Sequence, residues 1–289
     1  MYSAIASNKR NTIFIMMFFI VLVAGLGFVA SLYYGTWVFW GSMVGAAVYA
    51  LIQYFTAAKL ALAVNGAHEI KKSDNPRLYR IVENLAITNG MPMPKVYIID
   101  DPAPNAFATG RDPDNAYVAA TSGILEMMSD RELQAVMAHE MGHVKNYDIR
   151  VMMIVFGLVS AIGFIADMML RMSWFGGSDN RDRSPIFLIL GIAAALLAPV
   201  VAMLVQAAIS RQREYLADAT GAMTTRDPEG LATALEKIGD AGSALHRQNM
   251  STAHLFFSNP LKGGVAAAFS THPPIDERVA RLRSLGTKM

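Results

Sequence analysis

The pattern of apolar and polar positions divides the chain into alternating membrane-like and water-soluble stretches. Between residues 11 and 58 the sequence contains no Asp, Glu, Lys or Arg. A membrane-spanning helix needs about 20 apolar residues, so this stretch predicts two such helices, Ile13–Leu32 and Val38–Ala57. Residues 33–37, Tyr-Tyr-Gly-Thr-Trp, predict the turn between them, because Tyr and Trp favour the membrane interface.

Two later apolar runs, Val151–Leu170 and Ile186–Ile209, predict a second pair of spans. The later run contains Pro199, which a membrane helix tolerates as a kink. A cleaved signal peptide would be shorter than the first run and would end at a small-residue site, so that interpretation is rejected. The chain is predicted to cross a lipid bilayer about four times.

These spans divide the chain into four parts. They are an N-terminal transmembrane hairpin, a polar segment, a second transmembrane hairpin and a C-terminal polar segment: residues 1–58, 59–150, 151–209 and 210–289. Four spans place both polar segments on one side, where Lys and Arg flank the spans, and the positive-inside rule makes this side the cytoplasm. Arg181 and Arg183 in the opposite loop argue against this orientation.

Composition agrees with a membrane protein and excludes several functions. Hydrophobic residues make up 53% of the chain and charged residues 17%, against roughly 25% charged in a soluble domain. The net charge of +2 and the absence of a basic tract argue against a nucleic-acid partner. The chain has no cysteine, which excludes disulfides, thiolate metal sites and a cysteine nucleophile.

The first polar segment reads as mixed α and β structure. Asp74-Asn75-Pro76 predicts the start of a helix and Gly90 its end. Ser129 and Glu132 form a capping-box pattern that opens a second helix. Between the two helices we predict three strands, which are Lys95–Ile99, Asn105–Thr109 and Ala116–Ala120.

The helix that follows the capping box contains His139-Glu140-Met141-Gly142-His143, an HExxH pattern. Residues i and i+4 share one face of a helix, so both imidazoles can bind one metal ion. Glu140 lies beside them, where it can act as general base toward the attacking water. A zinc ion would acidify that water and polarise the scissile carbonyl. We therefore predict a hydrolytic zinc site with one ion per subunit.

A catalytic zinc ion usually has a third protein ligand. Glu214 and Asp218 share a helical face just after the fourth predicted span. Glu214 is a candidate for that ligand, and Asp218 is a candidate to hold a ligand imidazole by its second nitrogen. The alternative is a solvated helix at a membrane exit, where charged side chains are expected.

The chain resembles the HtpX family of membrane metalloproteases, which are relatives of the CAAX prenyl protease and Oma-type peptidases. The resemblance lies in the motif at 139–143, followed by two hydrophobic spans and then Arg211-Gln-Arg-Glu214-Tyr-Leu-Ala-Asp218. The resemblance extends over nearly the whole chain. It implies that Glu214 is the third zinc ligand and that Asp218 supports a zinc histidine. The expected fold is a mostly α integral membrane protein with an α+β zincin-like (gluzincin) domain and a small antiparallel sheet.

Three further elements have candidate roles, the first two of them by the same resemblance. Asn105, Ala106, Phe107 and Ala108 would form an edge strand that binds extended substrate by β-augmentation, or else an ordinary hairpin strand. His272, in the Thr271-His272-Pro273-Pro274 sequence, would stabilise the oxyanion or cap the following helix. Arg278 would pair with a carboxylate near the site or form a surface or structural salt bridge.

The sequence thus predicts a zinc-dependent endopeptidase of a bacterial-type inner membrane, with cytoplasmic catalytic segments and polypeptide substrates. Both expected ligand segments adjoin predicted spans, which favours damaged or misfolded membrane proteins as substrates and a role in protein quality control under stress. A site-2-type protease would carry the motif inside a span, a CAAX-type protease has more spans, and a non-enzymatic scaffold would not need Glu140. The oligomeric state has no signature in the sequence.

Overall fold

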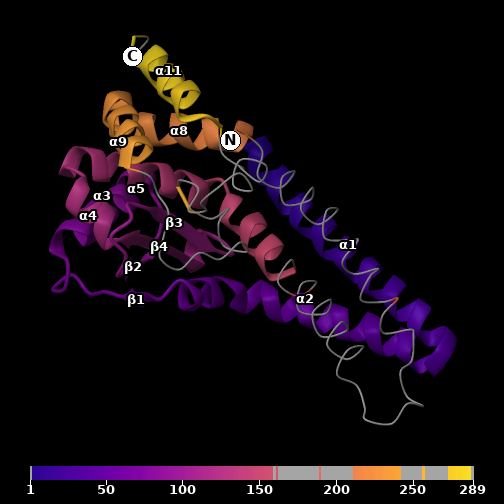
Figure 1. Cartoon of the computed structure of the whole chain (residues 1–289). Coiled ribbons are helices and arrows are strands. Elements are labelled where there is room, and N and C mark those ends of the chain that lie inside the picture. Colours follow the sequence, from indigo (N-terminus) through magenta and orange to yellow (C-terminus); the bar gives the residue numbers. More distant parts are fainter. Residues whose placement is uncertain are drawn as a thin grey trace. The chain divides into compact units, whose positions relative to one another are not determined.

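The structure, a computed structural model, describes residues 2–158, 161, 189, 211–241, 256–257 and 273–287 (Figure 1). The chain divides into two compact units. The first unit contains both polar segments and the extreme N-terminus: Met1–Lys9, Ala58–Met153 and Ile209–Met289. The second unit consists of two predominantly apolar stretches, Arg10–Ala57 and Ile154–Ala208.

Two long helices, which lie mostly in the second unit, have the length and composition needed to cross a membrane. They belong to α1 (Tyr2–Tyr34) and α2 (Trp37–Val64), with candidate spans Ile5–Leu32 and Trp37–Val64. Large apolar side chains such as Phe14 are exposed along them. The first predicted hairpin is therefore present, with a turn at Gly35. The other two predicted spans lie largely outside the described residues.

The first unit is built around a four-stranded sheet with the order β1-β2-β4-β3. Its strands are β1 (Ala67–Glu69), β2 (Lys95–Ile99), β3 (Ala106–Gly110) and β4 (Ala116–Thr121). The β1–β2 and β3–β4 pairs are antiparallel, but β2 and β4 run parallel. The expectation of an antiparallel sheet is therefore wrong, because the sheet is mixed.

Contacts between the loop after β2 and the end of β4 explain the parallel pair. The carbonyl of Asp101 accepts hydrogen bonds from the Ser122 hydroxyl at 2.9 Å and from the Gly123 amide at 3.0 Å. A Cβ atom on Gly123 would lie 1.9 Å from the Pro102 carbonyl oxygen, so only glycine permits this approach. These contacts hold the carboxyl ends of β2 and β4 together and leave β3 at the edge of the sheet.

Helices cover the sheet and carry the residues of the HExxH pattern. Asn75 caps α3 with its side chain, and Gly90 ends it in a left-handed conformation, as the sequence predicts. The helix α5 packs against β3 and β4 and against α3, α8 and α9 (Figure 1). The helix bounds are α3 (Pro76–Asn89), α4 (Ser122–Met127), α5 (Asp130–Lys145), α8 (Arg211–Thr225), α9 (Pro228–Ala241) and α11 (Ile275–Gly286), with a 3₁₀ turn at Pro113–Asn115.

Candidate metal centre

The helix α5 places His139, Glu140 and His143 in the interior of the first unit. It begins with the predicted capping box, in which Ser129 and Glu132 each accept a hydrogen bond from the other residue's backbone. Starting there, the helix directs its third and fourth turns into the core, where His139 is 0% exposed and His143 is 5% exposed. The spacing of four residues brings the two imidazoles to the same face, with their Nε2 atoms 3.1 Å apart.

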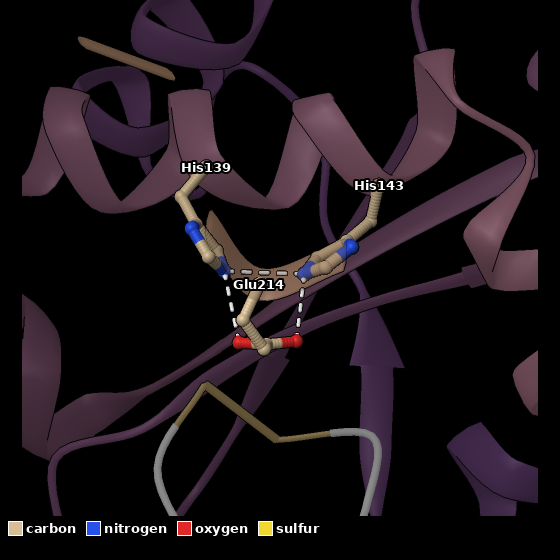
Figure 2. Close-up of side chains that lie close together, drawn as sticks. All are labelled: His139, His143 and Glu214. Carbon is tan, nitrogen blue, oxygen red and sulfur yellow. Dashed lines mark hydrogen bonds and ion pairs between the residues drawn. The ribbon is translucent and has the colours of Figure 1, made fainter. Parts of the chain in front are cut away.

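Glu214 completes a cluster of three ligand-type side chains (Figure 2). It lies in the first turn of α8 and is fully buried. Its Oε2 atom is 3.8 Å from His139 Nε2, and its Oε1 atom is 3.5 Å from His143 Nε2. Figure 2 shows both imidazoles pointing from α5 toward this carboxylate. The structure therefore brings together the three residues that the sequence analysis selected as ligands.

Close contact between the backbones of α5 and α8 makes this convergence possible. A Cβ atom on Gly221 would lie 2.9 Å from the backbone nitrogen of His139. One turn further along α5, a Cβ atom on Gly142 would lie 3.4 Å from the Cα atom of Ala217. Glycine and alanine at this crossing let α8 approach closely enough for Glu214 to face both histidines.

The Nδ1 side of His139 faces a buried ion pair between Asp218 and Arg278. Its Nδ1 atom lies 2.9 Å from Asp218 Oδ1. Asp218 in turn accepts two hydrogen bonds from Arg278 on α11, at 2.9 Å from Nε and 2.7 Å from Nη2. Arg278 is 1% exposed, so it forms a buried pair beside the cluster rather than a surface salt bridge. Because a carboxylate faces Nδ1, that nitrogen carries the proton and Nε2 presents its lone pair to the cluster.

His143 has a carboxylate partner of its own, which the sequence analysis did not identify. Its Nδ1 atom lies 3.1 Å from Oδ2 of Asp148, a residue that is 1% exposed. The chain turns back at Tyr147, whose φ of 62° is in the left-handed region. A non-glycine residue seldom adopts that conformation. The one available signal was an acidic residue five positions after the second histidine.

The two histidines have opposite shifts in proton affinity. Burial lowers the pKa of His139 to about 4, and the hydrogen bond with Asp218 only partly opposes it. For His143 burial acts in the same downward direction, but the hydrogen bond to Asp148 and the Glu214 carboxylate outweigh it and raise the pKa to about 9. His139 is therefore a neutral imidazole near pH 7. A metal ion bound here would have to displace a proton from His143, because only the neutral ring is a ligand.

Glu140 lies next to the cluster in a site that favours its protonated form. Burial raises the pKa of its carboxyl group to about 7, while His143 and a hydrogen bond from the Ala108 backbone amide act against that rise. Glu140 is 2% exposed. A carboxyl group with a pKa near neutrality can both accept and donate a proton at physiological pH.

The strand β3 lies at the edge of the sheet, as expected for Ala106–Ala108, whereas Asn105 lies just before the strand. Its outer edge is in contact with another part of the chain. Phe107 forms an antiparallel bridge with Phe256, and the Phe257 amide donates to the Ala106 carbonyl at 2.7 Å. The Phe257 ring also lies 5.0 Å from the His139 ring, centroid to centroid. The described residues 256–257 therefore occupy the edge where a substrate strand was expected.

The cluster fits a single metal ion by its donors and its dimensions. Two imidazoles and a carboxylate are the donor set of a common type of catalytic zinc site, with a fourth position open. A tetrahedral ion with bonds of about 2.0–2.2 Å separates its ligand atoms by roughly 3.3–3.6 Å. The three ligand atoms here all lie within 4.8 Å of one another and are buried. His272, the remaining predicted site residue, lies outside the described residues, and α11 begins three residues later at Ile275.

Comparison with known proteins agrees with this arrangement. The family model for peptidase family M48 matches residues 72–286. A protease HtpX homolog from Tropheryma whipplei (strain Twist) is 55% identical over 100% of this chain and 99% of its own length. Another from Streptococcus uberis is 42% identical over 99% of this chain and 100% of its own. The crystal structure of Ste24p from S. mikatae resembles the fold, with a TM-score of 0.53 and 18% identity, over 98% of this chain and 67% of that one.

Proposed function

This chain belongs to peptidase family M48 and is a membrane metalloprotease, and we propose that His139, His143 and Glu214 hold one zinc ion at its active site. The observation that carries the proposal is the buried cluster of two imidazoles and one carboxylate with Glu140 beside it. When bound, zinc would supply Lewis-acid polarisation of the scissile carbonyl and of the attacking water.

Glu140 is the general base in this proposal. Its carboxylate accepts a proton from water as the water attacks the peptide carbonyl, and it then donates that proton to the departing amine. A pKa of about 7 suits both transfers near neutral pH. Asp218 and Asp148 keep the Nδ1 protons of the two histidines in place, so that both Nε2 atoms remain ligands. The proposed role of His272 in stabilising the oxyanion stays a prediction.

The edge strand β3 is the proposed substrate-binding element. An extended polypeptide can pair with such an edge through backbone hydrogen bonds, and this would place its scissile bond near Glu140. The Ala108 amide is directed at Glu140, which supports the proximity of this edge to the reacting atoms. Because Phe256 is paired with Phe107, a substrate strand must displace it to pair at that position.

The proposed substrates are damaged or misfolded membrane proteins. The candidate span Ile5–Leu32 includes Asn8, whose side chain donates a hydrogen bond to Asp148 at 2.7 Å. Asp148 itself contacts His143. The metal ligands are thus two contacts away from a residue in the first turns of a candidate membrane helix. This proximity favours segments that emerge from a bilayer over freely diffusing peptides.

We further propose that the catalytic segments face the cytoplasm of a bacterial inner membrane and that the enzyme acts in the stress response. The distribution of Lys and Arg and the similarity to protease HtpX homologs support this assignment. A site-2-type enzyme is disfavoured, because α5 lies in the first unit, between a capping box and the polar residues 145–150. A CAAX-type enzyme is disfavoured by the smaller number of predicted spans.

The assignment is tested with Glu140→Gln in the full-length protein in detergent or proteoliposomes. We expect cleavage of an unfolded polypeptide to fall by on the order of 10²–10⁴-fold, because the proton acceptor is lost. Metal content, measured in parallel by mass spectrometry of the purified protein, is expected to remain at one zinc per chain, since the three ligands are unchanged.

Glu126→Gln is the matched control, because Glu126 is an exposed glutamate on α4 that does not belong to the cluster of His139, His143 and Glu214. It should keep both cleavage and metal. Full activity of Glu140→Gln would overturn the catalytic assignment, and wild-type protein free of zinc after purification in zinc-containing buffer would overturn the metal assignment. A much faster rate on soluble unfolded proteins than on reconstituted membrane proteins would contradict the proposed substrate class.

A further inference from the structure

The N-terminal residues contact the turn that holds one of the metal ligands. Asn8, on α1, is 2% exposed. Its side-chain amide lies 2.7 Å from Asp148 Oδ1 and 2.8 Å from the carbonyl oxygen of Asn146. An asparagine amide has two N–H donors, so both contacts can be made at once. One side chain therefore joins two residues of the same turn.

Tyr147, which lies between Asn146 and Asp148, also contacts a residue near the N-terminus. Lys9 places its ammonium group 4.8 Å from the centre of the Tyr147 ring, and Arg150 places its guanidinium 5.0 Å from the same centre. Tyr147 is the residue with a left-handed backbone, at φ 62°. A non-glycine residue seldom adopts such a conformation, which persists only where surrounding contacts impose it. Asn8 and Lys9 supply several of those contacts.

The geometry of this turn determines the position of His143. Asp148 uses Oδ1 to accept from Asn8 and Oδ2 to contact His143 Nδ1 at 3.1 Å. Arg213 Nε lies 3.7 Å from the same Oδ1 atom, on the side of α8. With both oxygens engaged, the carboxylate cannot rotate without losing a contact. The orientation of the His143 ring therefore depends on Asn8 through Asp148.

We propose that Asn8 is a positioning residue of the metal centre, and that the N-terminal end of the first membrane helix is thereby part of the peptidase site. The inference rests on the metal site proposed above. It assigns to a residue 140 positions before Asp148 a role that no feature of the HExxH motif indicates. A carboxylate that orients a ligand imidazole typically contributes about 10–100-fold to metal affinity, and Asn8 is expected to contribute about tenfold through it.

The test is the zinc affinity of the full-length protein in detergent, measured by competition with a chromophoric chelator. We expect Asn8→Ala to weaken zinc binding by about tenfold. Asn8→Asp should weaken it more, because it replaces the donor with a carboxylate facing Asp148 and the Asn146 carbonyl. Asn11→Ala, which removes the same side-chain amide one turn further along α1, is the control and should bind zinc as wild type does.

A double-mutant cycle with Asp148→Ala separates positioning from a general loss of stability. If Asn8 acts through Asp148, Asn8→Ala should change zinc affinity less than twofold once Asp148 is absent. Additive losses would overturn the proposal, as would wild-type affinity in both Asn8 variants.

Hydrogen exchange of the zinc-free protein is a second measurement. It is made on Asn8→Asp, which preserves side-chain volume, and so it tests the proposal even if Asn8→Ala folds poorly. Exchange at residues 146–148 should accelerate in the variant more than exchange in α3, and uniform acceleration would contradict the proposal. Failure of wild-type protein to bind zinc would instead refute the metal site itself.

Discussion

Asp148 Oδ2 lies 3.1 Å from Nδ1 of His143, five residues before it in the chain. His139 has an equivalent partner in Asp218, whose Oδ1 atom lies 2.9 Å from Nδ1. Each of the two proposed ligand histidines therefore faces its own carboxylate, one from the turn after α5 and the other from α8. The two orienting groups differ in their support. Asp218 accepts two hydrogen bonds from the buried Arg278. Asp148 accepts a hydrogen bond from the Asn8 amide and lies 3.7 Å from Arg213 Nε.

Removal of the Asp148 carboxylate should weaken the metal site without removing a ligand. For Asp148→Ala we expect zinc affinity to fall by about 10–100-fold, because the His143 ring loses the group that fixes its orientation and tautomer. Chelator competition measures the loss. Asp114→Ala, at an exposed aspartate of the 3₁₀ turn, should bind zinc as wild type does. An unchanged affinity in Asp148→Ala would show that Asp148 does not orient the ligand.

Gly221→Ala should disturb both the fold and the site. The added methyl group would lie 2.9 Å from the His139 backbone nitrogen and 3.1 Å from its Cα atom, so α8 has to move away from α5. We expect about 1–3 kcal/mol of lost stability, as for other overpacked cores, together with weaker zinc binding as Glu214 moves with the helix. Thermal unfolding and chelator competition measure the two effects.

Gly45→Ala is the matched change, since no heavy atom of the residues that the structure describes lies within 4 Å of a Cβ atom at that helical glycine. It should leave zinc binding unchanged and stability equal or higher, by up to about 1 kcal/mol. If Gly221→Ala instead behaves like Gly45→Ala, the close approach of the two helices is not what positions Glu214.

Glu132→Ala should destabilise the start of α5. The Glu132 carboxylate accepts from the Ser129 amide at 2.9 Å and from the Lys237 ammonium at 2.8 Å, so the change removes half of the capping box and a contact to α9. We expect a loss of about 1 kcal/mol in the free energy of unfolding. Chemical denaturation measures it, with Glu126→Ala as a solvent-exposed control. Equal stabilities of the two variants would contradict a role for the capping box.

Phe256→Ala should make β3 more accessible to substrate. The Phe256 and Phe107 rings pack edge to face, with centroids 4.9 Å apart. Such pairs contribute about 0.5–1.5 kcal/mol beyond burial, so weakening this one should lower KM for an unfolded polypeptide by roughly 2–10-fold. Steady-state kinetics separate this from kcat, which should change little. Met223→Ala, at an exposed apolar residue, is the control. A higher KM would show that Phe256 helps to bind substrate rather than competing with it.

Local sequence signals predicted the elements of the fold well. Helix α3 begins after Asn75 and ends at Gly90 as expected, and Lys95–Ile99 forms the predicted strand. Strand order was not predictable in the same way, because it depends on contacts such as Ser122 to Asp101 that only the folded chain brings together. The strand β1, three residues long, is too short to produce a periodic pattern.

Site residues that lie close together in the sequence were easier to predict than those that lie far apart. His139 and His143 follow from helical spacing alone, whereas Glu214 needed the resemblance to a known family because the predicted second hairpin separates it from them. Asp148 was missed because the left-handed turn at Tyr147 brings it back to His143, and tyrosine is not a residue type that predicts such a turn. The Asn8 contact had no sequence signal, since it joins residues 140 positions apart.

The separation of the ligands along the chain has a consequence for biogenesis. His139 and His143 precede the second predicted membrane hairpin, and Glu214 follows it. During translation the first two ligands are made early, but the third appears only after the hairpin has been synthesised. A catalytic zinc site needs all three ligands. On the proposed ligand assignment, a nascent chain would therefore stay inactive until the predicted second hairpin and Glu214 after it have been synthesised.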